Sequence, residues 1–509
     1  MLAIAFGAGT AHAASPALAG LDSYVRAAMA QWKVPGLAVA VVKDGRIVIA
    51  RGYGARELGK PERVDADTLF DIGSNTKAFT AAALGTLVSA GKLRWDDPVV
   101  RYVPTFRLES PYVTQEITLR DLLSHRTGYC DPFPMWYFSD DTTGNIIARL
   151  QYQKPRYGFR AHFCYNNTMY VVAAQLVPAL TGTSWNDYVA THLFTPLGMT
   201  RTVSTAAAVA AASDVAAPHG EVDGKVAVIK PYWANNMDVF AAVGGINSSV
   251  NDMSHWLMML LANGSYHGNK VLEPAMIRAM ETPQALIQED SELTGWLRTQ
   301  TPATRFYTYG LGFFLQDFGG HKLVWHAGDI DGMASALAFV PDEHLAVVAL
   351  SNLNGNRAPE GVVFHVLQTY LGLPQRDVSA AMHGYIQREK AESDATDRKL
   401  AAARMSGSQA PPLPLSAYAG NYSDPLYGAA QVQEEGGHLV LRLGNPMFVG
   451  DLQHWNGNTF QVKWRYRFYG KTYITFDVDA LDEPARLAFA QLPNQYERAP
   501  SGNSTATAH

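Results

Sequence analysis

Apolar residues near the start of the chain and again near residue 340 are arranged as β-hairpins. Residues 37–50 read LAVAVVKDGRIVIA, so two β-rich runs flank Asp44-Gly45, a pair typical of a tight hairpin turn. Residues 334–350 read ASALAFVPDEHLAVVAL and contain another pair of strand-like runs around a turn. The sequence therefore predicts strands at both ends of the region between these hairpins.

Between the hairpins the apolar residues recur at helical spacing. Residues 77–93 read KAFTAAALGTLVSAGKL, and residues 251–264 read NDMSHWLMMLLANG. Ser249 or Asn251 is suited to cap the second helix, and Gly264 is suited to end it. Strands near both ends of a region with helices between them predict an α+β fold, in which one antiparallel sheet is flanked by helices and lies beside an all-α lobe.

The pattern changes after about residue 375. Residues 376–405 are charged and helix-prone, and residues 406–416 read SGSQAPPLPLS, which is typical of a linker. From residue 418 to about residue 498, short alternating runs return between turn residues, as in HLVLRL, FQVKW, YITFDV and RLAFAQL. These runs predict a small all-β barrel or sandwich at the C-terminal end.

The first residues, MLAIAFGAGTAHAASPALAG, have features of an export signal. A short apolar stretch leads to Ala11-His12-Ala13, the small-x-small pattern of a signal peptidase site. The usual basic segment is missing, and a disordered, Ala-rich tail is the alternative. No other uncharged apolar run approaches the ~20 residues that span a bilayer, so we expect no transmembrane helix and a periplasmic or secreted protein.

These patterns divide the chain into five segments. We expect a signal peptide in residues 1–13, the α+β domain in 14–375, a helical segment and Pro-rich linker in 376–414, the small β-domain in 415–499, and a disordered tail in 500–509.

The composition suits a soluble globular protein and excludes some functions. Of the 509 residues, 47% are hydrophobic and 17% are charged, which allows a large core and two domains. The formal net charge is -5 and no dense Lys/Arg run occurs, so the basic face that nucleic-acid binding needs is not visible. The sequence contains neither HExxH nor the Cys/His spacing of a zinc site, and we predict no metal site.

The two cysteines, Cys130 and Cys164, leave two alternatives open. An exported compartment permits a disulfide, which would stabilise the fold by on the order of 4 kcal/mol in the chain-entropy model. Two buried free thiols are the other alternative.

Ser74 and Lys77, in FDIGSNTKAFTAAAL (residues 70–84), are the first candidates for catalytic chemistry. Ser74 opens the predicted helix, where backbone N–H groups and the positive end of the helix dipole lie. Residues three apart share a helix face, so the Lys77 amine could activate the Ser74 hydroxyl if burial or another cation lowers its pKa. The alternative is a Ser that caps the helix and a solvated Lys, which is how we interpret the second such tetrad, SAGK at residues 89–92.

Tyr165 and Asn167, in the one Tyr-x-Asn of the chain, are the second candidates. They precede an apolar run, so we expect them at a junction between a loop and a helix. A cationic neighbour stabilises a phenolate, so Tyr165 beside Lys77 could relay a proton to a leaving group. Asn167 offers a donor and an acceptor, which suits an amide substrate. A packed Tyr and a helix-capping Asn are the alternative.

His326 and Gly328, in the one His-x-Gly of the chain, are the third candidates. The preceding LVW reads as a strand, and Gly328 would let a ligand approach the backbone closely. The next N–H, on Asp329, could join that of Ser74 in an oxyanion hole. The alternative is a turn with a solvated His. The hydrolase elbow Gly-x-Ser-x-Gly is absent, which counts against an α/β-hydrolase.

The order Ser-x-x-Lys, Tyr-x-Asn and His-x-Gly resembles that of the penicillin-recognising serine hydrolases. This superfamily contains class C β-lactamases, D-Ala-D-Ala carboxypeptidases, D-aminopeptidases and related esterases. The segments LRDLLSHRTG, THLFTPLGM, AAVGGINSSVNDMSHWL and SALAFVPDEHLAVVALSN are also similar to that family, so the resemblance covers nearly all of residues 20–372. The segment LSAYAGNYSDPLYG, from Leu415, resembles the start of the lipocalin-like barrel that some members carry.

The resemblance implies a β-lactamase/transpeptidase-like fold and a role for each candidate residue. Ser74 would attack a carbonyl carbon and form an acyl-enzyme, which water would then hydrolyse. Lys77 and Tyr165 would transfer the protons, and which of them is the primary base is left open. The N–H groups of Ser74 and Asp329 would hold the oxyanion, with no need for a metal or cofactor. Three residues would contact the substrate: Asn167, His326 and Gly328.

The third motif departs from the family pattern. β-Lactamases and carboxypeptidases of this type usually carry Lys-Thr-Gly, whereas residues 326–328 read His-Ala-Gly. Because His is mostly neutral near pH 7, recognition of a free carboxylate is less expected, and the substrate class moves towards those of the aminopeptidases and esterases. The resemblance also places Cys130 and Cys164 near the cleft, where we expect a disulfide that clamps its rim.

The sequence thus predicts an exported serine acyl-hydrolase that acts on a D-amino-acid peptide, a β-lactam or an ester. The expected partner is a small molecule or short peptide, and the oligomeric state is not predicted. The alternative is a catalytically weak protein that binds or senses a penicillin or a peptidoglycan fragment.

Overall fold

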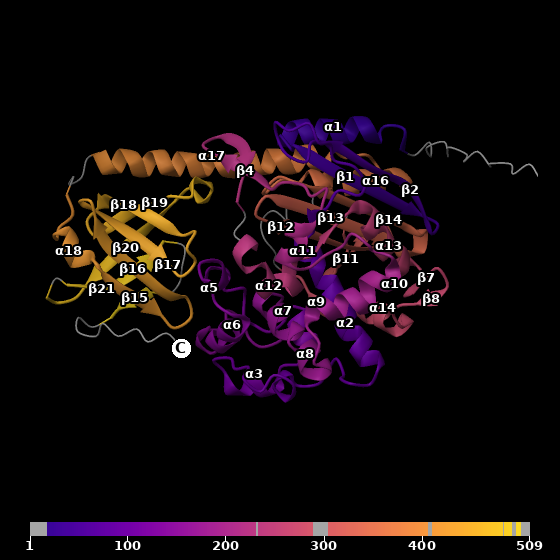
Figure 1. Ribbon diagram of the computed structural model, residues 1–509, viewed down its shortest axis with the longest axis horizontal. Helices are drawn as coiled ribbons and strands as arrows, with labels where there is room; N and C mark the ends of the chain where they lie inside the picture. The colour runs from indigo at the N-terminus through magenta and orange to yellow at the C-terminus, as the bar shows by residue number, and fades with distance from the viewer. Residues whose placement is uncertain are drawn as a thin grey trace, which may run out of the picture.

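The structure is a computed structural model that describes residues 18–230, 233–288, 304–405, 410–481, 483–490 and 495–499. These residues form an α+β domain and a β-barrel, which a long helix connects (Figure 1). The predicted fold class is therefore confirmed. The predicted signal peptide (1–13), part of the linker (406–409) and the C-terminal tail (500–509) lie outside the described residues.

The α+β domain is built on one antiparallel sheet. In the described part of the chain its strand order is β2-β1-β14-β13-β12-β11-β10-β9. Both predicted hairpins are present: β1 and β2 turn at Asp44-Gly45, which have φ of 52° and 71°, and β13 and β14 turn at residues 341–344. The strands are β1 (Gly36–Lys43), β2 (Arg46–Gly54), β9 (Ala285–Leu286), β10 (Tyr307–Tyr309), β11 (Phe314–Phe318), β12 (His321–Ile330), β13 (Met333–Val340) and β14 (Leu345–Ser351).

The central strands are apolar on both faces because helices cover both. Every residue of β13 and β14 is buried. One face packs against α1 (Leu21–Trp32), α16 (Ala358–Tyr370) and the start of α17 (Val378–Met405). The helical lobe covers the other face (Figure 1). Burial on both faces explains why these strands read as continuous apolar runs rather than as strict alternations.

The helix α2 (Thr76–Ser89) runs through the centre of the all-α lobe and is buried along most of its length. Phe79 stacks on Trp256 of α13 (Val250–Leu261), with ring centroids 4.0 Å apart. Ser249, one of the two predicted caps, caps α13 through its side chain. The lobe and its connections also contain α3 (Pro111–Glu116), α4 (Leu119–Leu123), α5 (Phe133–Tyr137), α6 (Thr143–Arg149), α7 (Asn167–Ala174), α8 (Leu176–Thr181), α9 (Trp185–Val189), α10 (Thr195–Leu197), α11 (Ala206–Ala211), α12 (Trp233–Gly244), α14 (Pro274–Met280) and the strand pairs β3 (Phe70–Asp71) with β6 (Asn247–Ser248), β4 (His219–Val222) with β5 (Lys225–Val228), and β7 (Ser265–Tyr266) with β8 (Asn269–Lys270).

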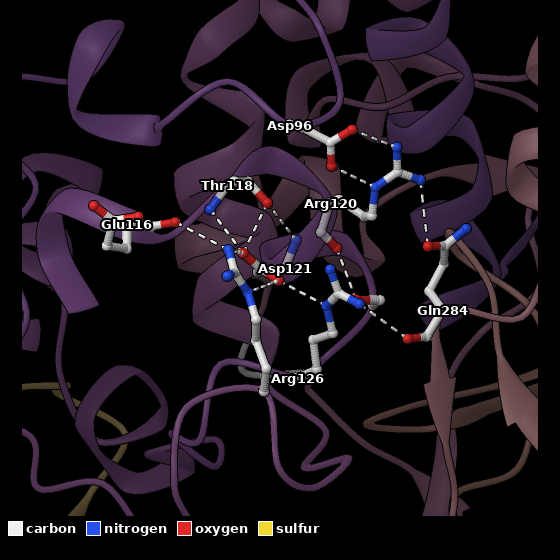
Figure 2. A network of polar contacts seen from close by, with 9 residues as sticks. Asp96, Glu116, Thr118, Arg120, Asp121, Arg126 and Gln284 are labelled. Carbon is white, nitrogen blue, oxygen red and sulfur yellow. Dashed lines mark hydrogen bonds and ion pairs between the residues drawn. The ribbon is translucent and has the colours of Figure 1, made fainter. Parts of the chain in front are cut away.

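A buried carboxylate, that of Asp121 on α4, ties this helix to the segments around it (Figure 2). It accepts hydrogen bonds from Arg126 at 2.6 Å, from Arg160 at 2.7 and 3.0 Å, and from the Thr118 N–H at 2.9 Å. Although burial alone would raise the pKa of Asp121, the hydrogen bonds from Arg160 and Thr118 hold that pKa below its usual value. The carboxylate thereby fixes residues 118–126 against the loop that contains Arg160.

The C-terminal domain is a closed barrel of antiparallel strands, so of the two predicted architectures the barrel is confirmed and the sandwich is wrong. Tyr418, Phe460 and Phe476 fill part of its interior, with the Tyr418 ring 5.1 and 5.0 Å from the other two. Helix α18 (Leu415–Tyr418) precedes the strands β15 (Gly420–Asp424), β16 (Gly428–Glu435), β17 (His438–Leu443), β18 (Val449–Asn456), β19 (Thr459–Trp464), β20 (Lys471–Val478), β21 (Pro484–Phe489) and β22 (Gln495–Arg498).

The barrel contacts the α+β domain at helix α5. The rings of Phe448 and Tyr469 stack at 4.3 Å and lie 5.4 and 5.8 Å from the ring of Tyr137. Asn445 donates from its backbone N–H to the Phe138 carbonyl at 2.8 Å and from its side-chain amide to the Tyr137 carbonyl at 3.2 Å. The barrel thus holds both the side chains and the backbone at the end of α5.

Gly328 allows β12 to lie directly against the segment that leads to α2. A Cβ at this position would lie 2.1 Å from the carbonyl oxygen of Ile72 and 2.4 Å from Oγ of Ser335. The Ser335 hydroxyl donates to that same carbonyl at 2.7 Å, so both neighbours are fixed. The contact requires a residue without a side chain.

We expect Gly328→Ala to lower the free energy of unfolding by about 1–3 kcal/mol, because the added methyl group forces two backbones apart. Gly384→Ala is a matched control: a Cβ there meets only the end of Arg388, at 3.7 Å, within helix α17. It should stabilise the protein by about 0.5–1 kcal/mol. Urea denaturation measures the free energy of unfolding of both variants. A Gly328→Ala protein as stable as the wild type would contradict the close contact between Gly328 and Ile72.

Candidate functional site

Ser74 lies at the entrance to helix α2. It is half-buried in a short 3₁₀ turn, Gly73–Asn75, and Gly73 starts this turn with φ of 52°. The turn is anchored by Asn75, whose side-chain amide donates to Oγ of Ser335 on β13 at 2.7 Å. Neither Ser74 nor Asn75 caps α2 through its side chain. The alternative that Ser74 is a helix cap is therefore wrong.

The Lys77 side chain is fully buried and lies against Ser74. Its Nζ is 2.9 Å from Oγ of Ser74 and 3.1 Å from the carbonyl oxygen of Val243. It also lies over the ring of Tyr165, 5.0 Å from the ring centroid. Burial lowers the pKa of Lys77 to about 7, and the negative charge of Asp131 opposes this shift. A large share of the molecules therefore carries a neutral amine at pH 7. The alternative of a solvated Lys77 is wrong, because the side chain is buried.

Tyr165 joins the same cluster, but its hydroxyl does not have the properties expected from the sequence. Its side chain hydrogen bonds with Ser74, and its ring lies 4.2 Å from that of His125. We expected a cationic neighbour to stabilise the phenolate. Instead, burial raises the pKa of Tyr165 above its usual value, and the charges of Asp131 and Asp329 raise it further. Tyr165 is therefore a neutral phenol in the resting site.

Asp131 is a residue of the site that sequence reasoning missed. Its carboxylate accepts hydrogen bonds from the backbone N–H of Asn167 at 3.1 Å and from the Asn167 side-chain amide at 2.8 Å. It also accepts from Nε1 of Trp136 at 3.3 Å. Because the Asn167 amide nitrogen faces Asp131, its carbonyl oxygen is left for another partner. The one available signal was its position, directly after Cys130.

A disulfide joins Cys130 to Cys164, with Cα atoms 5.0 Å apart. Each cysteine directly precedes a residue of the site: Cys130 precedes Asp131, and Cys164 precedes Tyr165. The Asp131 N–H also donates to the Tyr165 carbonyl oxygen at 3.0 Å. The bridge and this hydrogen bond hold the two residues side by side.

Asp329 lies next to the turn that carries Ser74. A Cβ on Gly73 would lie 2.9 Å from the backbone nitrogen of Asp329, so the two segments touch. The side chain of Asp329 points to an ion pair with Arg357. This arrangement leaves the N–H groups of Ser74 and Asp329 in neighbouring segments, as the predicted oxyanion hole requires.

His326 lies beside the cluster, with its ring centroid 6.2 Å from that of Tyr165, but it is not among the residues that line the cavity. It is buried, and both ring nitrogens have partners: Nε2 lies 3.0 Å from the hydroxyl of Tyr309, and Nδ1 lies 2.6 Å from the carbonyl oxygen of Ala327. Burial, together with the charge of nearby Lys77, lowers the pKa of His326 to about 3. His326 is therefore a neutral, buried side chain next to the cluster, and Gly328 lies against the backbone of Ile72.

A cavity of about 390 Å³ opens at Ser74 and Asn167. Most of its other lining residues were not predicted from the sequence. The aromatic run FPMWYF at residues 133–138 was a pattern that could have indicated some of them. The lining residues are Ser74, Phe133, Trp136, Tyr137, Asn167, Phe240, Val243, Gly244, Gly245, Asp329, Ile330, Asp331, Asn354, Gly355 and Arg357.

Two kinds of feature were not found in the described ranges. No group of three or more His, Cys, Asp and Glu side chains there could hold a metal ion. No helix among those residues is both long and apolar enough to cross a membrane.

The Beta-lactamase family model matches residues 21–371, which include Ser74, Lys77, Tyr165 and Asp329. The chain belongs to the Beta-lactamase family. A domain of unknown function (DUF3471) matches residues 405–501, the region of the barrel.

Relatives of this Beta-lactamase family chain include proteins of fungi and bacteria. It is 29% identical over 419 residues to "Unguisins hydrolase ungD'" of Aspergillus campestris, covering 79% of this chain and 75% of that protein. It is 24% identical over 347 residues to "Protein flp" of Staphylococcus aureus, covering 67% of this chain and 64% of that protein.

Two solved structures share the fold. An octameric penicillin-binding protein homologue from Pyrococcus abyssi aligns with a TM-score of 0.61 and 22% identity, over 94% of this chain and 99% of that one. SurE aligns with a TM-score of 0.55 and 19% identity, over 95% of this chain and 99% of that one. Both alignments extend over the α+β domain and the barrel, so the two-domain fold is shared.

The charge of Lys77 should set the pH dependence of Ser74 reactivity. We expect the rate at which a fluorophosphonate labels Ser74 to rise with pH through about 7, where Lys77 loses its proton. Because the carboxylate of Asp131 favours charged Lys77, Asp131→Asn should move the midpoint to lower pH. Between pH 7 and pH 10.5, the ordinary pKa of a lysine, Lys77 is protonated in the unfolded chain but neutral in the native protein. Lys77 therefore makes the free energy of unfolding rise with pH in this range.

The control for this experiment is Asp96→Asn, which removes an exposed carboxylate that is paired with Arg120. Its labelling midpoint should equal that of the wild type. A midpoint that stays in place or rises in Asp131→Asn would contradict the electrostatic role of Asp131.

Proposed function

We propose that the protein is an exported serine acyl-hydrolase that cleaves an amide or ester bond through an acyl-enzyme at Ser74. One observation carries the proposal: Oγ of Ser74, which lines the cavity, contacts both the buried amine of Lys77 at 2.9 Å and the side chain of Tyr165. An alcohol with a neutral amine and a neutral phenol beside it has both a base and an acid within reach.

In the first half of the proposed reaction, Lys77 accepts the Ser74 proton while Oγ attacks the carbonyl carbon. The oxyanion lies between the N–H groups of Ser74 and Asp329, which stabilise it as it forms. Tyr165 donates its proton to the leaving nitrogen or oxygen. The lowered pKa of Lys77 and the raised pKa of Tyr165 support this division of roles between base and acid.

In the second half, water releases the acyl group. The Tyr165 phenolate, stabilised by the Lys77 ammonium over its ring, accepts a proton from water, and the resulting hydroxide attacks the ester carbonyl. Oγ of Ser74 then leaves and takes back the proton from Lys77. All three residues return to their starting states, so the cycle consumes one water for each bond cleaved.

The names of the relatives support hydrolysis in this family without fixing the substrate. "Unguisins hydrolase" is named for hydrolysis of its own substrates, and the Pyrococcus abyssi protein is named as a penicillin-binding protein homologue. The competing proposal is a protein that binds or senses a penicillin or a peptidoglycan fragment with little turnover. Ligand binding without product formation would favour it.

We expect a fluorophosphonate to add mass to the wild-type protein but not to Ser74→Ala, and a penicillin is tested beside it as a second acylating reagent. Ser89→Ala is the matched control, since Ser89 belongs to the second Ser-x-x-Lys tetrad and lies exposed at the end of α2. Mass spectrometry of the intact proteins reads the adduct, and a panel of a chromogenic cephalosporin, D-amino-acid amides and p-nitrophenyl esters reads turnover. A wild type that neither reagent labels would argue strongly against the acyl-enzyme.

Tyr165→Phe should lower kcat by about 10²-fold or more, because the leaving group then lacks its proton donor. Tyr112→Phe, which removes a hydroxyl from a side chain that is 68% exposed, should not change kcat. Steady-state kinetics on the best substrate of the panel compares the two. Near wild-type turnover of Tyr165→Phe would exclude the proposed role of the phenol.

A further inference from the structure

The cavity beside Ser74 has an aromatic wall. Trp136 of α5 lies 4.8 Å from Phe240 of α12 between ring centroids, and Phe133 stacks on Tyr137 at 4.5 Å. Ile330 extends the apolar surface. The wall is rigidly supported because the barrel packs behind α5 and hydrogen bonds to its C-terminal end. Such a surface favours bulky apolar groups, which lose contact with water when they enter.

The one basic side chain among the described lining residues is already neutralised. Arg357 forms ion pairs with Asp329 and, at 3.3 Å, with the buried carboxylate of Glu360. Its side chain is only 19% exposed. A substrate carboxylate would have to displace one of these acids from a largely desolvated pair, which is costly.

A further acid faces the cavity. The hydroxyl of Tyr137 donates to the carboxylate of Asp331, with distances of 2.8 and 2.7 Å to its two oxygens. The lining residues that the structure describes thus include two acids, Asp329 and Asp331, against one cation, Arg357. An anion that enters the cavity would come close to both carboxylates, and like charges repel.

Neither His326 nor Lys77 adds a cation to the described residues that line the cavity. His326 stands where the β-lactamases of this family usually carry a Lys, but it is buried, neutral and bonded at both nitrogens. Lys77 lies beneath Ser74 and is not a lining residue.

From the aromatic wall, the paired Arg357 and the excess of acids, we propose that the substrate group entering this cavity is bulky and apolar and carries no free carboxylate. The proposal rests on the proposed acyl-hydrolase function and names its substrate class. It excludes substrates that are recognised through a carboxylate in this cavity, as free peptide C-termini and penicillins would be.

Matched esters, assayed with the full-length protein, test the charge preference on both sides of the scissile bond. The first pair is the 4-nitrophenyl esters of monomethyl glutarate and of glutarate. The second pair is the phenylacetyl esters of methyl 4-hydroxybenzoate and of 4-hydroxybenzoate. One of the two pairs carries its free carboxylate on the side of the scissile bond that enters the cavity. In that pair kcat/KM should be about tenfold higher for the neutral ester than for the carboxylate ester, after correction for spontaneous hydrolysis. A ratio near one in both pairs, or a faster carboxylate member in either, would overturn the proposal.

A third pair tests the apolar wall. The 4-nitrophenyl ester of phenylacetate should have a kcat/KM about tenfold above that of acetate, and Trp136→Ala should remove this advantage. Equal values for the two esters in the wild type would overturn the preference for bulk.

A charge variant links the preference to the cavity. Asp331→Asn should reduce the neutral-to-carboxylate ratio, whereas Asp342→Asn, an exposed acid at the far end of β13, should leave the ratio unchanged. An unchanged ratio in Asp331→Asn would contradict the charge argument. If no ester is cleaved faster by the wild type than by Ser74→Ala, the proposed function itself fails. If esters are cleaved but without these preferences, only the substrate class fails.

Discussion

The contact between the buried amine of Lys77 and the hydroxyl of Ser74 is the interaction on which the site depends. An amine enters a protein interior as a neutral base much more readily than as a cation, and burial lowers the pKa of Lys77 to about 7. The same burial keeps Tyr165 protonated. One physical cause, the loss of water around the cluster, therefore sets the protonation states of both neighbours of Ser74.

The rest of the architecture holds this desolvated cluster in place. The sheet supplies β12 and β13, which meet the Ser74 turn through Gly328 and Ser335. The disulfide from Cys130 to Cys164 and the carboxylate of Asp131 fix the opposite side. The barrel supports the aromatic wall from behind, so the C-terminal domain contributes to the cavity although none of its residues lines it among those described.

The fold could be predicted from the sequence because its signals are local. The Asp44-Gly45 turn, the Ser249 cap and the alternating runs of the barrel each depend on neighbouring residues. The Ser74–Lys77 pair was also local, since one helical turn brings the two together. The burial of His326 and the role of Asp131 could not be predicted, because they depend on residues far away in the chain, Tyr309 for the first and Asn167 for the second. The pKa of Tyr165 was misjudged because burial raises it and the charges of Asp131 and Asp329 act in the same direction, and a sequence does not report burial.

A crystal structure of the protein treated with a phenyl-substituted alkylboronic acid would show whether Lys77 and Tyr165 both reach a group bound to Ser74. We expect a bond between boron and Oγ of Ser74, with Nζ of Lys77 and the Tyr165 hydroxyl both within hydrogen-bond distance of the adduct. One boronate oxygen should accept from the N–H groups of Ser74 and Asp329. An adduct on another residue, or a Ser74 adduct with Lys77 and Tyr165 out of contact, would contradict the account.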